Sequence, residues 1–526
     1  MIRSYSALSL LLLIVITSFA TAAVAQKAGG TWRLSLDENP PSASIHEENT
    51  INNLRPYMAV FNNLVLFDQR IARASPDTIR PELATEWKWS KEGTVLTMKL
   101  RQGVKWHDGK PFTSADVKCT WDTLRGVRDA GWRKNPHRDW YKNLQEIAPN
   151  GEYEVNFKLG RPQPAFLSFL AAGFSPVYPC HVDGRQMRER PIGTGPFKFG
   201  SFEQSKSIKL VKNSDYWKPG RPHLDAIEWR IIPSAATREL AFIAGEFDFI
   251  SIPASKLKEV KAQVPDAQCH SGLSYSTFYL LLNPDVPPLN DIRVRRAMAL
   301  TLDRKVFGEL SDGLTKIGTS MMPPPSGVWG LPPEEMAKLP GYSADVEKNR
   351  EEARRLMRQA GYGPEKRLKM TMSTRNLMSY KDPAVLVMDW LSKIYVETDL
   401  EIQETNTWYA NVARKKLVLA VNSQGAGIDD PDNVFSTYNC GGSYNPTNYC
   451  DRDIQAKIDE QSTILDPAKR KQLVWEIDRL LQENVVRPIL FYNAGVTCER
   501  LYVKGYPFFE NGQYNHWRFE DIWLDK

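Results

Sequence analysis

The chain has 526 residues, more than one hydrophobic core usually supports, which predicts at least two domains. Its formal net charge of +6 comes from 68 basic and 62 acidic residues, and so small an excess does not indicate a nucleic-acid-binding protein. Hydrophobic residues make up 42% and charged residues 25%, which is the balance of an ordinary globular protein.

The N-terminus has the pattern of a secretory signal peptide. Arg3 precedes an apolar run over residues 7–19, and small residues at 23 and 25 mark a cleavage site between Ala25 and Gln26. The run is short for a membrane anchor, which must cross ~30 Å of hydrocarbon, and no Cys follows it that could carry a lipid. We expect residues 1–25 to be removed and the mature chain to be soluble and exported.

The first half of the mature chain predicts strands with a few short helices. Residues 30–36 and 152–159 alternate with a period of two, as strands do. Residues 94–112 predict a strand, a glycine turn and a short second strand, and a helix capped by Thr113 or Ser114 follows. Residues 223–250 predict a strand, a helix and a strand, a succession that favours an α/β fold.

The second half contains two candidate crossings between domains. Residues 279–291 run from an apolar strand into a proline-rich link, and residues 486–495 form a later strand. Helices are predicted between them, one ending at Gly361 and one opening at Asp466 with a proline in its first turn. Two crossings so far apart imply that one domain is inserted in another, with a hinge and a cleft that can close on a ligand.

All six cysteines lie in the mature part, and an even number in an exported protein permits disulfides. Cys440 and Cys450 bracket a loop without helical or strand pattern, so we expect them to pair. The other four allow three pairings or none: Cys119, Cys180, Cys269 and Cys498. Zinc is the rival interpretation, but no CxxC or HxxxH motif occurs, so no metal site is expected.

Motifs for catalysis are missing from the sequence. It contains no GxSxG or HExxH motif, and 193-GTGPFK-198 lacks the third glycine of a dinucleotide loop. The acidic run 425-GAGIDDPDNVFSTYNC-440 lacks the glycine and the final glutamate of a calcium loop. A turn followed by a helix N-cap explains part of this run. We therefore expect no enzymatic activity and no cofactor.

Six segments, in this order, resemble the extracellular solute-binding proteins of family 5, the receptors of ABC importers for dipeptides, oligopeptides, nickel chelates, glutathione and opines. They are 81-PELATEWKW-89, 100-LRQGVKWHDGKPFTSADV-117, 192-IGTGPFKF-199, 237-TRELAFIAGEFDFI-250, 290-NDIRVRRAMALTLDR-304 and 429-DDPDN-433. The resemblance implies a two-lobe α/β periplasmic binding protein, type II-like and of cluster C, with an inserted subdomain and a two-crossing hinge. It also implies no catalysis and a soluble location in the periplasm of a Gram-negative bacterium. We expect lobe I to comprise 26–58, 191–285 and 496–526, its inserted subdomain 59–190, and lobe II 286–495.

The resemblance also implies ligand-binding residues. Arg375 matches the arginine that takes a ligand carboxylate in peptide-binding members, and Asn376 lies beside it. Gly427 stands where those members carry the aspartate for the ligand's amino group, and Gln424 replaces their aromatic residue. Asp429 is a candidate substitute for the missing acid.

Two further contacts are implied for the cleft. Trp408 resembles a position that could form an apolar wall, and the loop 37–49 with His46 would contribute backbone groups from lobe I. We expect a monomeric receptor that captures a small carboxylate-bearing solute, such as a modified peptide or an opine, and delivers it to a membrane permease with its ATPase. The alternative is an exported hydrolase or chaperone that reuses this fold.

Overall fold

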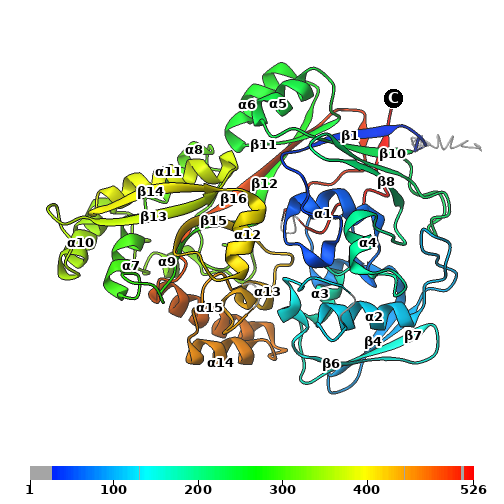
Figure 1. Cartoon of the computed structure of the whole chain (residues 1–526), viewed down its shortest axis with the longest axis horizontal. Coiled ribbons are helices and arrows are strands. Elements are labelled where there is room, and N and C mark those ends of the chain that lie inside the picture. The colour runs from blue at the N-terminus through cyan, green and yellow to red at the C-terminus, as the bar shows by residue number, and fades with distance from the viewer. Residues whose placement is uncertain (1–25, 129–130, 443–444, 511–513) are drawn as a thin grey trace, which may run out of the picture.

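A computed structural model of the chain describes residues 26–128, 131–442, 445–510 and 514–526 and shows two lobes joined by two long strands (Figure 1). The predicted signal peptide lies outside the described residues. Among the residues described, no helix is both long and apolar enough to cross a bilayer.

Lobe I is built on a four-stranded sheet in the order β1-β10-β9-β8. Its strands are β1 (Thr31–Leu36), β8 (Phe197–Glu203), β9 (Ser207–Lys212) and β10 (Ala226–Ile231). β1 runs parallel to β10, and the other neighbours are antiparallel. The alternation that predicted β1 is the burial pattern of the strand, because Trp32, Leu34 and Leu36 all face the core.

A second sheet lies within residues 59–190. Its order is β4-β5-β7-β6, all antiparallel, with β4 (Ala84–Trp89), β5 (Val95–Leu100), β6 (Leu144–Pro149) and β7 (Glu154–Leu159). The short second strand predicted within 94–112 is only an isolated bridge between Lys105 and Pro111. One hydrophobic core includes side chains from this sheet and from β1 and β10, so the two sheets of lobe I are packed as one body.

Short helices complete lobe I. They are α1 (Ile51–Tyr57), α2 (Ser114–Leu124), α3 (Phe166–Ala171) and α4 (Gly184–Glu189). Two hairpin-like pairs are β2 (Val65–Phe67) with β3 (Ile79–Pro81) and β17 (Val503–Lys504) with β18 (Trp523–Leu524). The predicted cap of α2 is a capping box between Thr113 and Asp116.

Lobe II contains most of a six-stranded sheet in the order β11-β16-β12-β15-β13-β14. The strands are β11 (Phe249–Ile252), β12 (Gln268–Leu282), β13 (Leu368–Arg375), β14 (Val396–Gln403), β15 (Leu419–Gly425) and β16 (Ile489–Glu499). Phe278, Leu280 and Leu282 of β12 enter one core and Tyr279 and Leu281 enter another, because successive side chains point to opposite faces.

Helices cover both faces of this sheet. Packed in the first core are α7 (Ile292–Leu300), α8 (Lys305–Leu310), α10 (Val346–Gln359) and α11 (Met378–Ser392). Packed in the second are α12 (Thr405–Ala413), α13 (Pro431–Phe435), α14 (Arg452–Gln461) and α15 (Pro467–Glu483). The short helix α9 (Pro333–Met336) lies between α8 and α10 in sequence.

Strands β12 and β16 cross between the lobes. They lie side by side and antiparallel, and both extend beyond lobe II to β11, which is flanked by α5 (Ala235–Ile243) and α6 (Leu257–Gln263) (Figure 1). Both predicted crossing segments overlap these strands. β12 already enters the core of lobe II at Leu273, so the crossing lies inside the strand and precedes the proline-rich link.

Three disulfides connect all six cysteines. Cys440 pairs with Cys450, as predicted, and the undecided four form Cys119–Cys180 and Cys269–Cys498. The last bridge joins β12 to β16, the two crossing strands, at directly opposite positions.

Candidate functional site

Arg375 ends β13 at the junction of the lobes. Its Nη2 donates to Glu38 Oε1 of lobe I at 3.2 Å and to Thr405 Oγ1 of α12 at 2.7 Å, and its Nη1 donates to the Tyr380 hydroxyl at 3.0 Å. Thr405 Oγ1 in turn donates to Glu38 Oε2 at 2.6 Å. The loop 37–49 of lobe I therefore contributes a charged side chain, that of Glu38, to the site. The sequence had predicted that this loop contributes backbone groups.

The Arg375 guanidinium is charged and almost fully buried. Its side chain is 6% exposed, and it lies over the rings of Tyr380 and Tyr409 at 4.7 and 5.6 Å. Burial alone would lower the pKa of Arg375, but the hydroxyls of Tyr380 and Tyr409 and the carboxylate of Glu38 raise it overall. Such a fork can hold a carboxylate with two parallel hydrogen bonds.

Gly427 lies against an aromatic side chain of lobe I. A Cβ built on it would meet Trp140 Cη2 at 3.1 Å, and its carbonyl accepts from Asn515 Nδ2 at 2.6 Å. Trp140 is buried and stacks on Phe169 with ring centroids 4.8 Å apart. A side chain at position 427 would therefore press on the indole, which would have to shift to admit it.

Gln424 lies on β15, three residues before Gly427, and bonds to an arginine that the sequence analysis did not single out. Arg487 Nη1 donates to Gln424 Oε1 at 3.0 Å. Ser423, the neighbour of Gln424, shares a 2.8 Å hydrogen bond with the Tyr380 hydroxyl that also binds Arg375. Because successive side chains of a strand point to opposite faces, Ser423 joins the Arg375 network and Gln424 bonds Arg487 on the other face of β15.

The three aspartates after Gly427 lie in two environments, one shared by Asp430 and Asp432 and one of Asp429. Asp430 caps α13 and accepts both terminal donors of Arg470 at 2.9 and 2.7 Å, and Asp432 accepts from Arg470 at 3.1 Å. Asp429 lies in a buried setting beside Tyr275, where desolvation raises its pKa to about 7. The helix cap predicted for this run is thus formed by Asp430, and two of its acids hold a structural arginine.

The remaining predicted site residues lie outside this network. Asn376 is exposed, and its side chain donates to Glu404 at 2.7 Å. Trp408 is fully buried in the core of lobe II. His46 lies in the core of lobe I, where its ring bonds the carbonyl of Pro176 at 2.8 Å and stacks on Tyr178. Roles in ligand binding for these three stay predictions.

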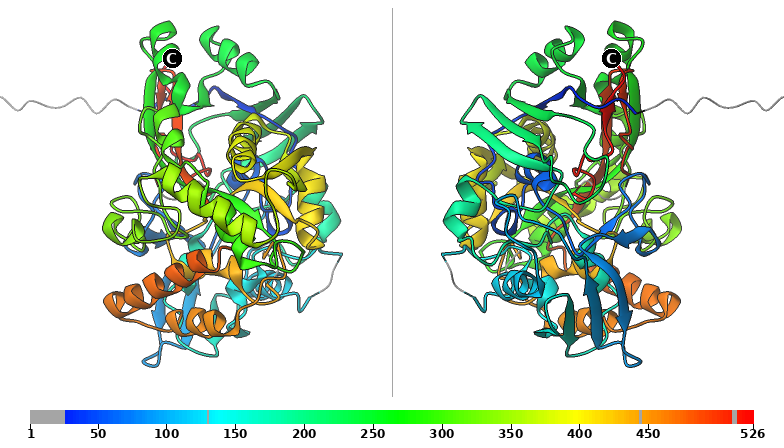
Figure 2. Two further views of the ribbon diagram at one scale, coloured as in Figure 1. Left: turned by 90° about the vertical axis from the view of Figure 1, so that its left-hand side faces the viewer. Right: turned by 90° about the vertical axis from the view of Figure 1, so that its right-hand side faces the viewer.

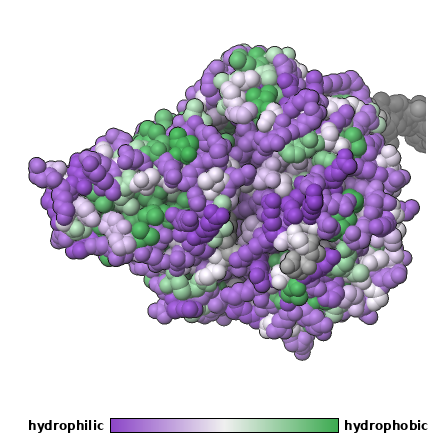
Figure 3. All heavy atoms as spheres, in the orientation of Figure 1, coloured by the Kyte–Doolittle hydropathy of each residue, from purple (hydrophilic) through white to green (hydrophobic). Residues whose placement is uncertain are grey.

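A cavity of about 300 Å³ separates the lobes where residues 139–169 face α13 and α14. Contacts across this region include Arg161 Nη2 to Asp459 Oδ1 at 3.4 Å and Gln163 Nε2 to Asp432 Oδ2 at 3.1 Å. Figure 2 shows α14, α15 and the strands of residues 84–159 at the same end of the molecule. Figure 3 shows hydrophilic residues bordering the hollow between the lobes.

Comparisons with known proteins agree with this architecture. Residues 78–446 match the model of the bacterial extracellular solute-binding proteins, family 5 Middle. The chain is 28% identical over 348 residues to the oligopeptide-binding protein AppA of Bacillus subtilis, an alignment that covers 62% of this chain and 61% of that relative.

Two solved structures share the fold over nearly the whole chain. The periplasmic binding protein DppA of Helicobacter pylori, in complex with the peptide STSA, has a TM-score of 0.83 at 22% identity and covers 95% of this chain and 99% of its own. AgaA of A. tumefaciens R10, in complex with agropinic acid, has a TM-score of 0.81 at 21% identity and covers 94% and 99%. The similarity confirms the predicted two-lobe fold.

Proposed function

This chain belongs to the bacterial extracellular solute-binding proteins of family 5, and on that premise we propose that it is the periplasmic receptor of an ABC importer. It captures a small carboxylate-bearing solute, which is peptide-like, a modified peptide or an opine. It acts as a monomer without catalysis and delivers the solute to a membrane permease and its ATPase. The similarity of the chain to an oligopeptide-binding protein supports the peptide-like class.

The observation that carries this proposal is the position of Arg375. Its buried guanidinium lies on lobe II and is bound by a carboxylate, Glu38, that comes from lobe I. A ligand carboxylate at the same guanidinium would therefore lie between the lobes. Because such a ligand contacts both lobes, it binds the closed form better than the open form and shifts the population toward closure.

The surroundings of Gly427 favour a ligand without a free α-amino group at that point. An ammonium group needs a carboxylate partner when it is buried, and a side chain at position 427 would press on Trp140, whose Cη2 lies 3.1 Å from the place of its Cβ. Asp429 lies two residues on, with its side chain beside Tyr275. We therefore propose a solute whose nitrogen is acylated, alkylated or absent there.

We also propose the division of the chain into lobes given above, with one change. The first crossing is placed inside β12, near Leu273, because residues from Leu273 onward pack in the cores of lobe II.

The test begins with mass spectrometry of the small molecule released when the purified protein is denatured. We expect a carboxylate-bearing compound, and calorimetry with that compound should show binding that is lost in Arg375→Ala. Incubation with candidate peptides and glycosides should give no product. Steady turnover would support the exported hydrolase, and a released compound without a carboxylate would contradict the proposed solute class.

A further inference from the structure

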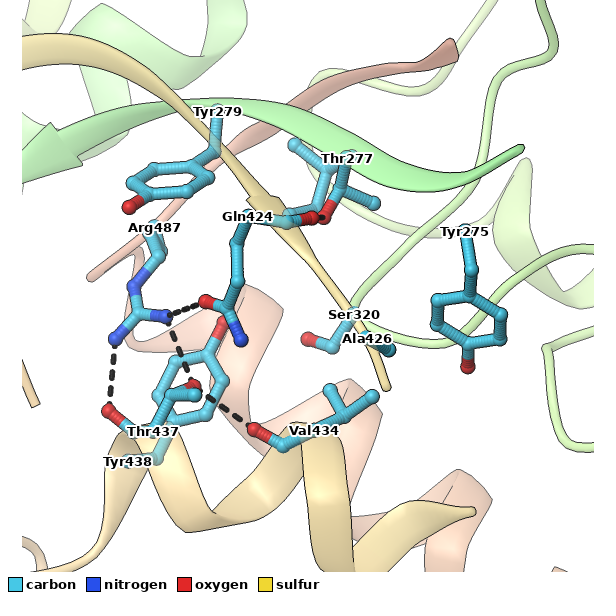
Figure 4. A pocket seen from close by; sticks show the side chains of 11 residues that line it. Tyr275, Thr277, Tyr279, Ser320, Gln424, Ala426, Val434, Thr437, Tyr438 and Arg487 are labelled. Carbon is cyan, nitrogen blue, oxygen red and sulfur yellow. Dashed lines mark hydrogen bonds between the residues drawn. The ribbon is translucent and has the colours of Figure 1, made fainter. Parts of the chain in front are cut away.

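A small cavity inside lobe II surrounds the buried end of Arg487. It lies between β12, β15 and the first residues of β16 on one side and the segment 434–438 on the other (Figure 4). Its polar lining includes Thr277, Ser320, Gln424 and Thr437. The enclosed space is about 10 Å³, the room of about one water molecule.

Arg487 is buried without a carboxylate partner. It is 4% exposed, and it donates to Gln424 Oε1 at 3.0 Å and to the side chain and carbonyl of Thr437 at 3.0 and 2.9 Å. The rings of Tyr279 and Tyr438 lie 5.2 and 4.2 Å from the guanidinium carbon. In the part of the chain that the structure describes, all these partners are neutral. A buried charge held only by neutral groups is costly, and an anion would compensate it.

Other buried arginines show that this arrangement is unusual here. Arg375, Arg470 and Arg518 each have a carboxylate partner. Arg295 and Arg304 have none among the described side chains, but both donate to backbone carbonyls, which cannot move away.

Gln424 differs from those carbonyls because it is a partly exposed side chain that lines the cavity. Its amide oxygen can rotate away from Arg487 without disturbing β15. The rotation frees the Nη1 donor that Gln424 held, and this charged donor can bind a carboxylate oxygen while Thr437 keeps the guanidinium in place.

We propose that Arg487, gated by Gln424, is a second carboxylate subsite, so that the solute carries two carboxylates, one for Arg375 and one for Arg487. This inference rests on the proposed function, because it assumes a ligand held between the lobes at Arg375. The two arginines lie beside neighbouring tyrosines. Arg375 lies over Tyr409, which interacts electrostatically with Tyr279, and Arg487 lies over Tyr279. The solute class is therefore a dicarboxylate whose nitrogen is not a free α-amine.

The test uses two probes that differ in one charge, N-acetyl-alanyl-glutamate and N-acetyl-alanyl-glutamine, titrated into the full mature protein by calorimetry. The wild type is expected to bind the glutamate probe about tenfold or more tightly, the effect of one buried charge-assisted contact. Arg487→Met is expected to remove this preference and keep the affinity for the glutamine probe. Arg295→Met, the loss of a buried arginine away from the cavity, should keep the preference.

Gln424→Glu tests the subsite by placing a carboxylate of the protein itself beside Arg487. Its carboxylate would pair with Arg487, so we expect the preference to disappear and the melting temperature to rise by about 2–4 °C. A lower melting temperature, no preference in the wild type, or a preference that survives Arg487→Met would overturn the subsite. If neither probe binds the wild type, the proposed carboxylate receptor fails as well. If both probes bind equally and Arg375→Ala abolishes this binding, the receptor proposal stands and only the subsite is refuted.

Discussion

Arg375→Ala is expected to weaken solute binding by ~2–5 kcal/mol, because truncation leaves a ligand carboxylate without its buried partner. Calorimetry measures this loss. The matched control is Glu38→Gln, which keeps the guanidinium and its bonds to Thr405 and Tyr380 but removes the interlobe charge. Equal losses in both variants would mean that Arg375 acts in lobe closure and not as a ligand contact.

Arg375 and Arg487 are both buried guanidinium groups of lobe II, but only one of them could be predicted from the sequence. The segment around Arg375 resembles a family motif, whereas Arg487 stands before a proline with no spacing signal. The replacement of the family's aromatic residue by Gln424 was the available hint that the neighbouring pocket had changed. The role of Trp408 could not be decided from the sequence, because an apolar side chain suits a cleft wall and a core equally well, and the residue is fully buried.

His46 is expected to make the fold sensitive to acid. Burial lowers its pKa to about 3, well below the ordinary 6.5, so between these values the unfolded chain binds a proton that the folded chain does not. Stability therefore falls as the pH drops below 6.5, by about 2 kcal/mol for this group at pH 5. His46→Gln should reduce the loss of urea resistance between pH 7 and pH 5, and an unchanged pH dependence would contradict the assignment.

Helices and strands could be predicted from the sequence where their signals lie within the segment itself. The helices α10 and α15 begin one residue after Asp345 and Asp466, whose side chains accept backbone hydrogen bonds as N-caps. Strand β12 could not be predicted at its full length, because its first half lies among exposed and polar residues and is fixed by pairing with β16, more than 200 residues away. Pairing across such a distance leaves no pattern within either segment.

The disulfide between β12 and β16 is expected to stabilise the fold more than the one that closes the loop at 440–450. The bridges span 229 and 10 residues, and the entropy lost by the unfolded chain grows with the loop that is closed. Removing Cys269–Cys498 by double serine substitution should cost about 5 kcal/mol, against about 3 kcal/mol for Cys440–Cys450. Denaturant midpoints of the two variants give the ranking, and the reverse order would show that hinge strands are held by pairing alone.

Closure of the molecule on a solute depends on how closely the two lobes can approach each other. Gly427 of lobe II and Trp140 of lobe I are in direct contact. Gly427→Ala would put a Cβ 3.1 Å from Trp140 Cη2, a distance at which the indole must move although it is stacked on Phe169. Because this contact joins residues of different lobes, the overpacking cost of ~1–3 kcal/mol falls on the closed form. Solute affinity should drop about 5- to 150-fold by calorimetry, since binding requires closure.

The second substitution Trp140→Phe in the same chain should recover most of that affinity, because the smaller ring makes room for the added methyl group. Gly308→Ala is the matched control, since a Cβ at Gly308 in α8 meets no atom within 4 Å. Small-angle scattering with saturating solute should show a larger radius of gyration for Gly427→Ala than for the wild type. Full affinity in Gly427→Ala would mean that the lobes close on the solute without bringing Trp140 against position 427. In that case Trp140 would no longer explain why an amine-binding acid is missing from position 427.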